Sequence, residues 1–111
     1  MPLRILPKKK QAFASLQKLQ KKYQASIFID SGWAKHWQLP PGLKRAKKDI
    51  YYLPAGEKAK SWQELEKCLA FLAERNHQRS APIIVIGGGA ACDLGALVAS
   101  LYRRGTPLIL V

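Results

Sequence analysis

The residues best suited to chemistry in this sequence are three consecutive glycines, Gly87, Gly88 and Gly89. They follow the apolar run 82–86 and precede a segment whose apolar residues have helical spacing. Because glycine has no Cβ, the backbone can turn sharply there and a ligand can approach its amides closely. The first amides of a helix are unpaired, and the helix dipole makes that end positive. This order favours a diphosphate-binding turn; the alternative is a tight connection that binds nothing.

The glycine turn departs from the common dinucleotide fingerprint Gly-x-Gly-x-x-Gly. That pattern requires glycine at position 92, where the chain has Cys92, and an acid about 20 residues further on, where there is none. The sequence therefore lacks the signature of an ordinary Rossmann dehydrogenase. Cys68 and Cys92 have no metal-ligand spacing, and two cysteines are too few for a disulfide scaffold.

Strands and helices alternate around this turn. The predicted strands are 3–6, 26–30, 49–53, 82–86 and 108–111, and the predicted helices are 11–23, 33–37, 62–75 and 91–103. Parallel strands need crossover helices, and crossovers are right-handed. The expected fold class is therefore α/β, an open, mostly parallel Rossmann-like sheet with helices on both faces.

Two of the predicted helices have clear start and packing signals. Ser61 and Glu64 have the spacing of a capping box, in which the hydroxyl and the carboxylate each meet a free helix amide. Helical periodicity directs two apolar sets toward the core: Trp62, Leu65, Leu69 and Leu72 in one helix, and Leu94, Leu97, Val98 and Leu101 in the other. His36 and His77 belong to no motif, and we expect both at the surface.

Composition and charge narrow the class of protein. The chain has 111 residues, 48% of them hydrophobic, which fits one globular domain or part of one. It has no apolar run long enough for a membrane span and no signal peptide, so a cytoplasmic setting is expected. Residues 1–60 carry 14 Lys and Arg against 3 Asp and Glu. Such an excess suits anionic partners, but the lysines are scattered along the chain and no nucleic-acid motif is present, so a solvated surface is expected instead.

Three segments together resemble the amino-terminal domain of the 3-dehydroquinate synthase family: residues 53–61, 86–94 and 98–107. They match, in order and spacing, a Gly-Glu-x-x-Lys loop, a Gly-Gly-Gly-x-x-Gly-Asp turn and an Arg-Gly pair. The resemblance implies that residues 26–111 form an NAD-binding α/β domain, on which residues 1–25 pack as a basic strand and helix segment.

The activity that the resemblance implies is a lyase reaction of the shikimate pathway. Family members convert 3-deoxy-arabino-heptulosonate 7-phosphate to 3-dehydroquinate and release phosphate. Their bound NAD removes a hydride from the substrate and later returns it, and a divalent metal, usually zinc, polarises the oxygen being oxidised.

The resemblance also implies roles for polar residues. Asp30 corresponds to the acid that holds the adenosine ribose, since a carboxylate can accept hydrogen bonds from both hydroxyls. Glu57 and Lys60 correspond to the loop that touches NAD, and Asp93 to the acid near the nicotinamide ribose. Arg104 corresponds to an arginine that helps to bind the anionic substrate. Without the resemblance, the same residues suit a turn acid, a solvated loop and charges near helix ends.

The remaining cofactor contacts come from the glycine turn and its helix. The turn under the diphosphate corresponds to Gly87, Gly88 and Gly89, and Cys92 replaces the glycine usual beside the cofactor. Gly95 is also displaced by one position relative to a helix-packing glycine of the family. We expect these changes to affect the affinity for NAD more than they affect the relationship to the family.

Family members continue beyond the matched segments with a domain that carries the metal ligands and the substrate lysines. Residues 1–111 contain none of those segments, and His36 and His77 do not replace the ligands. We therefore expect no metal and no catalytic residue in this truncated domain, and no synthase activity from it alone. We also expect self-association through the surface that a second domain would cover.

Two alternatives stay open. Glycerol dehydrogenases and iron-type alcohol dehydrogenases share the glycine turn, but they often carry a lysine two or three residues after the acid, where this chain has Gly95 and Ala96. The chain could therefore be the NAD-binding half of such a protein or of another sugar-phosphate cyclase. The second alternative is a non-catalytic basic α/β binding module.

Overall fold

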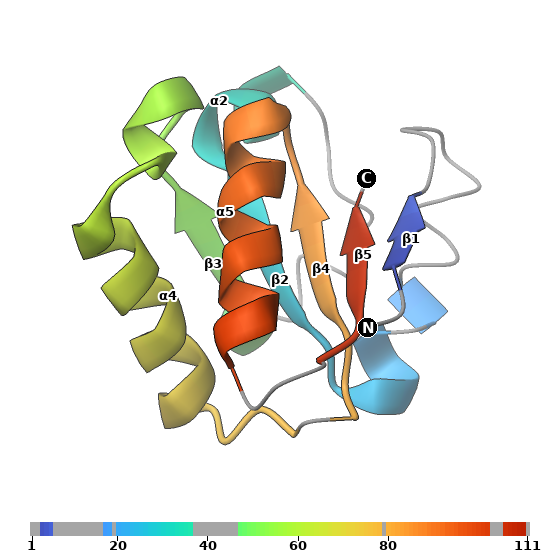
Figure 1. Cartoon of the computed structure of the whole chain (residues 1–111). Helices are drawn as coiled ribbons and strands as arrows, with labels where there is room; N and C mark the ends of the chain where they lie inside the picture. Colours follow the sequence, from blue (N-terminus) through green and yellow to red (C-terminus); the bar gives the residue numbers. More distant parts are fainter. Residues whose placement is uncertain are drawn as a thin grey trace.

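The computed structural model describes residues 3–5, 17–18, 20–36, 47–78, 80–102 and 106–110. The elements are, in order, β1 (Leu3–Ile5), β2 (Ser26–Asp30), α2 (Ser31–His36), the 3-10 turn η1 (Lys47–Asp49), β3 (Ile50–Leu53), the 3-10 turn η2 (Gly56–Ala59), α4 (Trp62–Glu74), β4 (Ile83–Ile86), α5 (Gly89–Leu101) and β5 (Leu108–Leu110). Residues 20–23 are helical too. All five predicted strands are present (Figure 1). Within these ranges, no helix has the length and apolar character needed to cross a membrane.

The five strands form one sheet in the order β1-β5-β4-β2-β3, and every described pairing is parallel. The α/β prediction is thus confirmed, with a sheet that is parallel throughout. The chain runs from β2 to its neighbour β3 and then crosses back to β4, on the other side of β2. This reversal makes the gap between β2 and β4 the topological switch point, where open α/β sheets bind ligands beyond the carboxyl ends of the strands.

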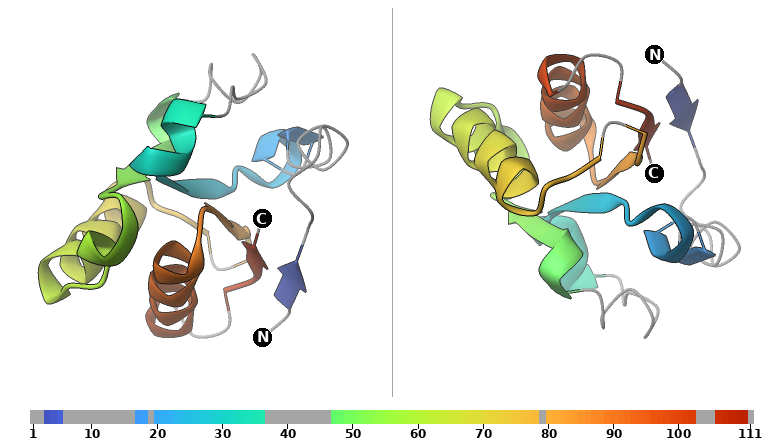
Figure 2. Two further views of the ribbon diagram at one scale, coloured as in Figure 1. Left: turned by 90° about the horizontal axis from the view of Figure 1, so that it is seen from above. Right: turned by 90° about the horizontal axis from the view of Figure 1, so that it is seen from below.

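Helices cover both faces of the sheet, as predicted. Helices α4 and α5 lie on one face and α2 lies on the other (Figure 2). Alternate strand residues supply two cores, because successive side chains of a strand point to opposite faces. Phe28 and Val85 belong to the α4/α5 side, whereas Ile29 and Ile86 face Trp33 of α2. All four residues of β4 are buried, as expected for a central parallel strand.

The start of α4 confirms half of the predicted capping box. The Ser61 hydroxyl accepts a hydrogen bond from the Glu64 amide at 3.1 Å. The predicted bond from the Glu64 carboxylate to the cap amide is wrong, because the Ser61 amide donates to the Ala59 carbonyl at 3.0 Å. The Glu64 carboxylate is instead buried against β3, where it accepts a hydrogen bond from the Tyr51 hydroxyl at 3.3 Å.

Three residues that were predicted to face the core are exposed: Trp62 at 78%, Leu97 at 44% and Leu101 at 54%. In α4 the buried stripe runs through Glu64, Cys68 and Leu72, so Trp62 falls beside it. In α5 small residues such as Ala91 and Gly95 let the helix approach the sheet on a stripe that includes Leu94 but is rotated away from Leu97 and Leu101.

The expectation that His77 lies at the surface is also wrong, since its side chain is 2% exposed. Its Nδ1 lies 2.6 Å from the Ser26 hydroxyl, and its Nε2 lies 2.9 Å from the Ala81 carbonyl. The Tyr102 hydroxyl donates to the His77 carbonyl at 2.8 Å. The contacts with Ser26 and Ala81 give both ring nitrogens a hydrogen-bond partner, so the imidazole is buried without an unsatisfied polar atom. The side chain of His36 lies outside the described part of the chain.

Candidate functional site

The carboxyl ends of β2 and β4 bring Asp30 and the glycine turn together. Asp30 is the last residue of β2, and Gly87 directly follows β4, the hydrogen-bonded neighbour of β2. A Cβ added to Gly87 would lie 2.8 Å from the Asp30 Cβ and 2.9 Å from the Ala91 Cβ. Only glycine fits there without a shift of the backbone, because nothing larger than hydrogen leaves room for the Asp30 side chain. Both groups therefore lie at the switch point of the sheet.

Gly88 and Gly89 face open space. A Cβ at either position would meet no heavy atom within 4 Å, and both residues are exposed. Gly88 is the N-cap of α5, and its carbonyl accepts a hydrogen bond from the Cys92 amide at 3.0 Å. The amides of Gly89, Ala90 and Ala91 come before this first intrahelical bond and have no carbonyl partner within the helix. Gly88 and Gly89 are the exposed residues at this start of α5, where the positive end of the helix dipole and the unpaired amides suit an anionic group.

Asp30 holds the loops around the turn. Its side chain accepts hydrogen bonds from two backbone amides, that of Trp33 at 2.9 Å and that of Gly56 at 3.1 Å. The carboxylate therefore caps α2 and also fixes the loop that leads into η2. Each carboxylate oxygen can accept a second hydrogen bond, so contact with a ribose is chemically compatible and stays a prediction.

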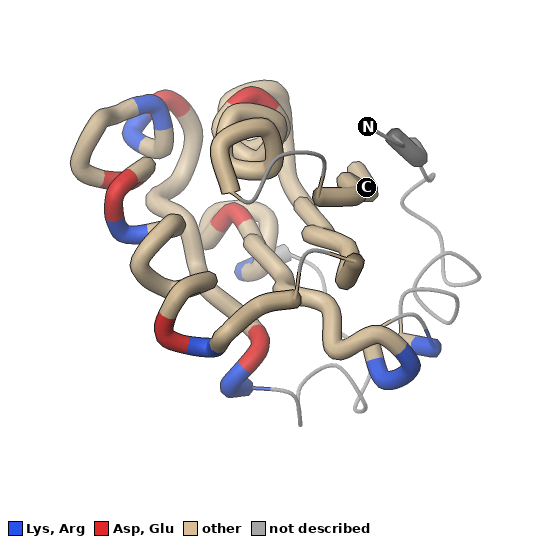
Figure 3. Tube along the Cα trace, turned by 60° about the horizontal axis from the view of Figure 1, so that its bottom comes forward, with Lys and Arg blue, Asp and Glu red and all other residues tan. Residues whose placement is uncertain are grey.

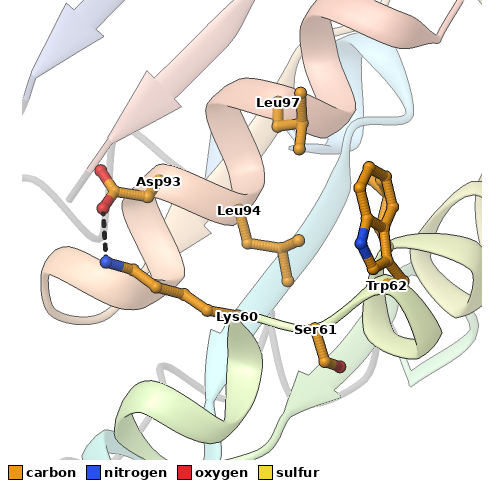
Figure 4. Close-up of a pocket in the computed structure, with 7 residues that line it drawn as sticks. Lys60, Ser61, Trp62, Asp93, Leu94 and Leu97 are labelled. Carbon is orange, nitrogen blue, oxygen red and sulfur yellow. Dashed lines mark ion pairs between the residues drawn. The ribbon is translucent and has the colours of Figure 1, made fainter.

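Lys60 joins the loop after η2 to helix α5. Its ammonium lies 3.1 Å from Asp93 Oδ2 and 3.7 Å from Glu57 Oε2 (Figure 4 draws the first pair). The hydrogen bond with Asp93 and the charge of Glu57 raise the pKa of Lys60. Three predicted site residues, Glu57, Lys60 and Asp93, therefore lie close together. They place one hydrogen-bond donor beside two carboxylate acceptors at the end of the sheet where the glycine turn lies.

The first residue of helix α5 differs from the predicted one. The helix begins at Gly89, two residues earlier than expected, so Asp93 lies beyond the first turn. Its position is explained by the pair with Lys60 rather than by the helix dipole, which acts within the first turn. Cys92 is half-buried, and its Sγ lies 3.9 Å from the Gly87 carbonyl, beside the turn. Arg104 lies outside the described residues.

A cavity of about 270 Å³ lies between α4 and α5. It is lined by Lys60, Ser61, Trp62, Leu65, Asp93, Leu94 and Leu97 (Figure 4). The cavity shares the Lys60–Asp93 pair with the group described above, whereas the three glycines do not line it. Sequence reasoning missed this cavity because it assigned Trp62 and Leu97 to the core. In the part of the chain that the structure describes, no group of three His, Cys, Asp or Glu side chains is placed to hold a metal.

A parallel sheet with helices on both faces and a glycine turn at its switch point defines the class: an open, doubly wound α/β domain. The family model described as 3-dehydroquinate synthase N-terminal matches residues 50–111, more than half of the chain, and the chain belongs to this family.

Curated relatives agree with the family match. The chain is similar to the 3-dehydroquinate synthase of Tropheryma whipplei, with 48% identity over 59 residues, which cover 53% of this chain and 16% of that protein. The 3-dehydroquinate synthase of Dictyoglomus thermophilum is 41% identical over 63 residues, and that of Shewanella denitrificans is 36% identical over 63 residues. These two matches each cover 57% of this chain and 18% of the relative. The chain therefore matches less than a fifth of the length of these relatives.

Proposed function

We propose that this chain is the NAD-binding part of a 3-dehydroquinate synthase, in the reaction that forms 3-dehydroquinate and phosphate. The observation that carries the proposal is the convergence of the open glycine turn with Asp30 and the Lys60–Asp93 pair at one edge of the sheet. Membership in the family supports the same function.

The described residues fit the cofactor. The amides of Gly88, Gly89 and Ala90 would hold the diphosphate, because they lie at an open helix start. Lys60 and Asp93 would bind a ribose diol, since the pair presents a donor and an acceptor 3.1 Å apart. NAD supplies the acceptor and later the donor of the hydride when bound. The residues of this chain hold and orient the cofactor.

Turnover needs groups beyond this set, so the chain alone should be inactive. The family's metal ligands and substrate lysines belong to segments that these 111 residues do not contain. With substrate, NAD and zinc supplied, we expect no phosphate release from the purified chain. Turnover above that of a mock preparation would contradict this part of the proposal.

Calorimetric titration with NAD tests the cofactor site. We expect weak, saturable binding to residues 1–111, since the contacts proposed here involve one side of the cofactor. Gly88→Val should weaken binding at least about tenfold, equivalent to about 1.4 kcal/mol, because the side chain would cover the amides that face open space. Glu66→Gln, an exposed change on α4, is the control and should bind like the wild type. Absence of NAD binding, or equal binding by Gly88→Val, would overturn the proposal.

Self-association is part of the same proposal. The exposed side chains of Trp62, Leu97 and Leu101 lie on α4 and α5, and such apolar groups favour contact with another surface. Sedimentation should show a concentration-dependent increase in mass, reduced by Trp62→Gln. A monomer at all concentrations would exclude it.

A further inference from the structure

The edge of the sheet opposite the glycine turn carries two groups of exposed lysines. Lys18, Lys21 and Lys22 lie in helical residues that precede β2, and Lys47 and Lys48 lie in η1, directly before β3. Strands β2 and β3 are parallel, hydrogen-bonded neighbours, so their amino ends meet at the same edge. Figure 3, with the bottom of the molecule turned forward, shows blue segments at two places along this edge.

A side-chain bridge joins the two groups. Gln20, between the first lysines, donates a hydrogen bond from Nε2 to Asp49 Oδ2 at 2.5 Å. Arg75 forms an ion pair with the same carboxylate, and its guanidinium also donates to the Ser26 hydroxyl. Asp49 is therefore committed to Gln20 and Arg75. Among the acids of residues 17–30 and 47–49, the other is Asp30, at the far edge. Among the residues that the structure describes, none of the five lysines forms an ion pair with an acid.

An aromatic ring lies within the first group. Tyr23 is 44% exposed, and the ammonium of Lys22 lies 5.1 Å from the centre of its ring. An exposed ring next to cations can stack on a nucleobase while the cations contact phosphates. Tyr23 is also the one large apolar side chain exposed among described residues 17–24 and 47–49. Protein interfaces usually have an apolar centre depleted in lysine, so this composition does not favour a protein partner.

We propose that this lysine face, formed by Lys18, Lys21, Lys22, Tyr23, Lys47 and Lys48, binds single-stranded nucleic acid. The lysines contact the phosphodiester backbone, and Tyr23 stacks on a base. The sequence argued against nucleic acid because the lysines are scattered along the chain, and the fold brings five of them to one edge. This second site lies at the opposite edge from the proposed NAD site and does not depend on it.

The size of the lysine face sets the expected salt dependence. Each phosphate contact to a single strand contributes about −0.7 to the slope of log K against log salt. Five contacts give a slope of about −3.5, so affinity should fall about 100-fold between about 50 and about 200 mM salt.

Fluorescence anisotropy with a labelled oligothymidylate measures this binding. Lys21→Gln/Lys22→Gln and Lys47→Gln/Lys48→Gln should each make the slope shallower by about 1.4. The matched control, Lys35→Gln/Lys58→Gln, removes the same charge from exposed positions outside the lysine face and should keep the wild-type slope. Tyr23→Leu should weaken binding about tenfold or more at an unchanged slope, because it removes stacking and no charge.

The proposal would be overturned by no binding at low salt, by equal losses in the face and control variants, or by tighter binding to anionic vesicles or an acidic peptide than to the oligonucleotide. Saturating NAD should leave the anisotropy unchanged, and competition by NAD would also exclude a separate face. Thermal unfolding of each variant separates lost binding from lost folding. Failure here leaves the calorimetric test of NAD binding unaffected.

Discussion

We predict that the close contact between Gly95 and Val85 holds α5, and with it the glycine turn, against the sheet. Gly95 is buried in α5, and a Cβ added there would lie 2.3 Å from Cγ2 of Val85 in β4. The two positions therefore share one side-chain volume. Because β4 and α5 flank Gly87 and Gly88, a change in their separation would move the turn.

A side chain at residue 95 would overpack the space that Val85 already fills. Overpacking a core costs about 1–3 kcal/mol, and a contact of 2.3 Å places Gly95→Ala near the upper end. Replacing a helical glycine regains about 1 kcal/mol, so we expect a net loss of about 2 kcal/mol in the free energy of unfolding. Val85→Ala removes two buried methyl groups and should also lose about 2 kcal/mol.

In the double variant, the new methyl at residue 95 occupies the volume that Val85 vacates. The free energy of unfolding of the double variant should lie within about 1 kcal/mol of the wild-type value. Since the single changes would together lose about 4 kcal/mol if they were independent, this corresponds to a coupling energy of about 3 kcal/mol between the two positions. Urea unfolding with unchanged m-values measures all three variants. Gly89→Ala is the control, since a Cβ there meets nothing within 4 Å and should change stability little. Additive losses from the two single changes would refute the shared volume.

Two further predictions concern the N-cap residue of α4 and a buried cysteine within this helix. Ser61→Ala should lower the free energy of unfolding by about 1 kcal/mol because the Glu64 amide loses its acceptor, and Ser61→Asp should retain most of it; equal losses in urea would contradict this. Burial raises the pKa of the Cys68 thiol to about 12, with a smaller effect of the Glu64 charge. The folded thiol thus keeps its proton where the unfolded thiol loses it, so stability should fall as pH rises from about 9 toward 12. Chemical unfolding of Cys68→Ala should show a shallower decline, and an unchanged pH profile would contradict the assignment.

Local signals were sufficient for the strands and for the glycine turn. The apolar run that ends at Ile86 has glycines directly after it, so both the strand and its end could be read from neighbouring residues. Asp30 was recognised in the same way, as an acid at the end of a buried strand. Its bond from the Trp33 amide is local, as expected for a turn acid, but its bond from the Gly56 amide was not predictable, because Gly56 lies 26 positions away along the chain.

The errors arose where tertiary packing selects among similar residues. Periodicity placed Trp62 and Leu97 on the inward faces, but a close approach of α5 to β4 requires Gly95, and the buried stripe follows that contact. His77 was assigned to the surface because no motif includes it. Its burial depends on Ser26, which is 51 positions away, and on Ala81 across a turn, and only the folded chain brings these partners together.

The parallel sheet separates two kinds of chemistry by strand direction. Residues that follow strands, such as Asp30 and Gly87, meet at one edge, and residues that precede strands, such as Lys22 and Lys48, meet at the other. Asp30 links this topology to the cofactor site, because its hydrogen bonds fix α2 and the loop toward Lys60 while its Cβ closes the space at Gly87. The proposed NAD surface is therefore formed by contacts within the described residues, which fix the relative positions of the glycine turn, Asp30 and Lys60.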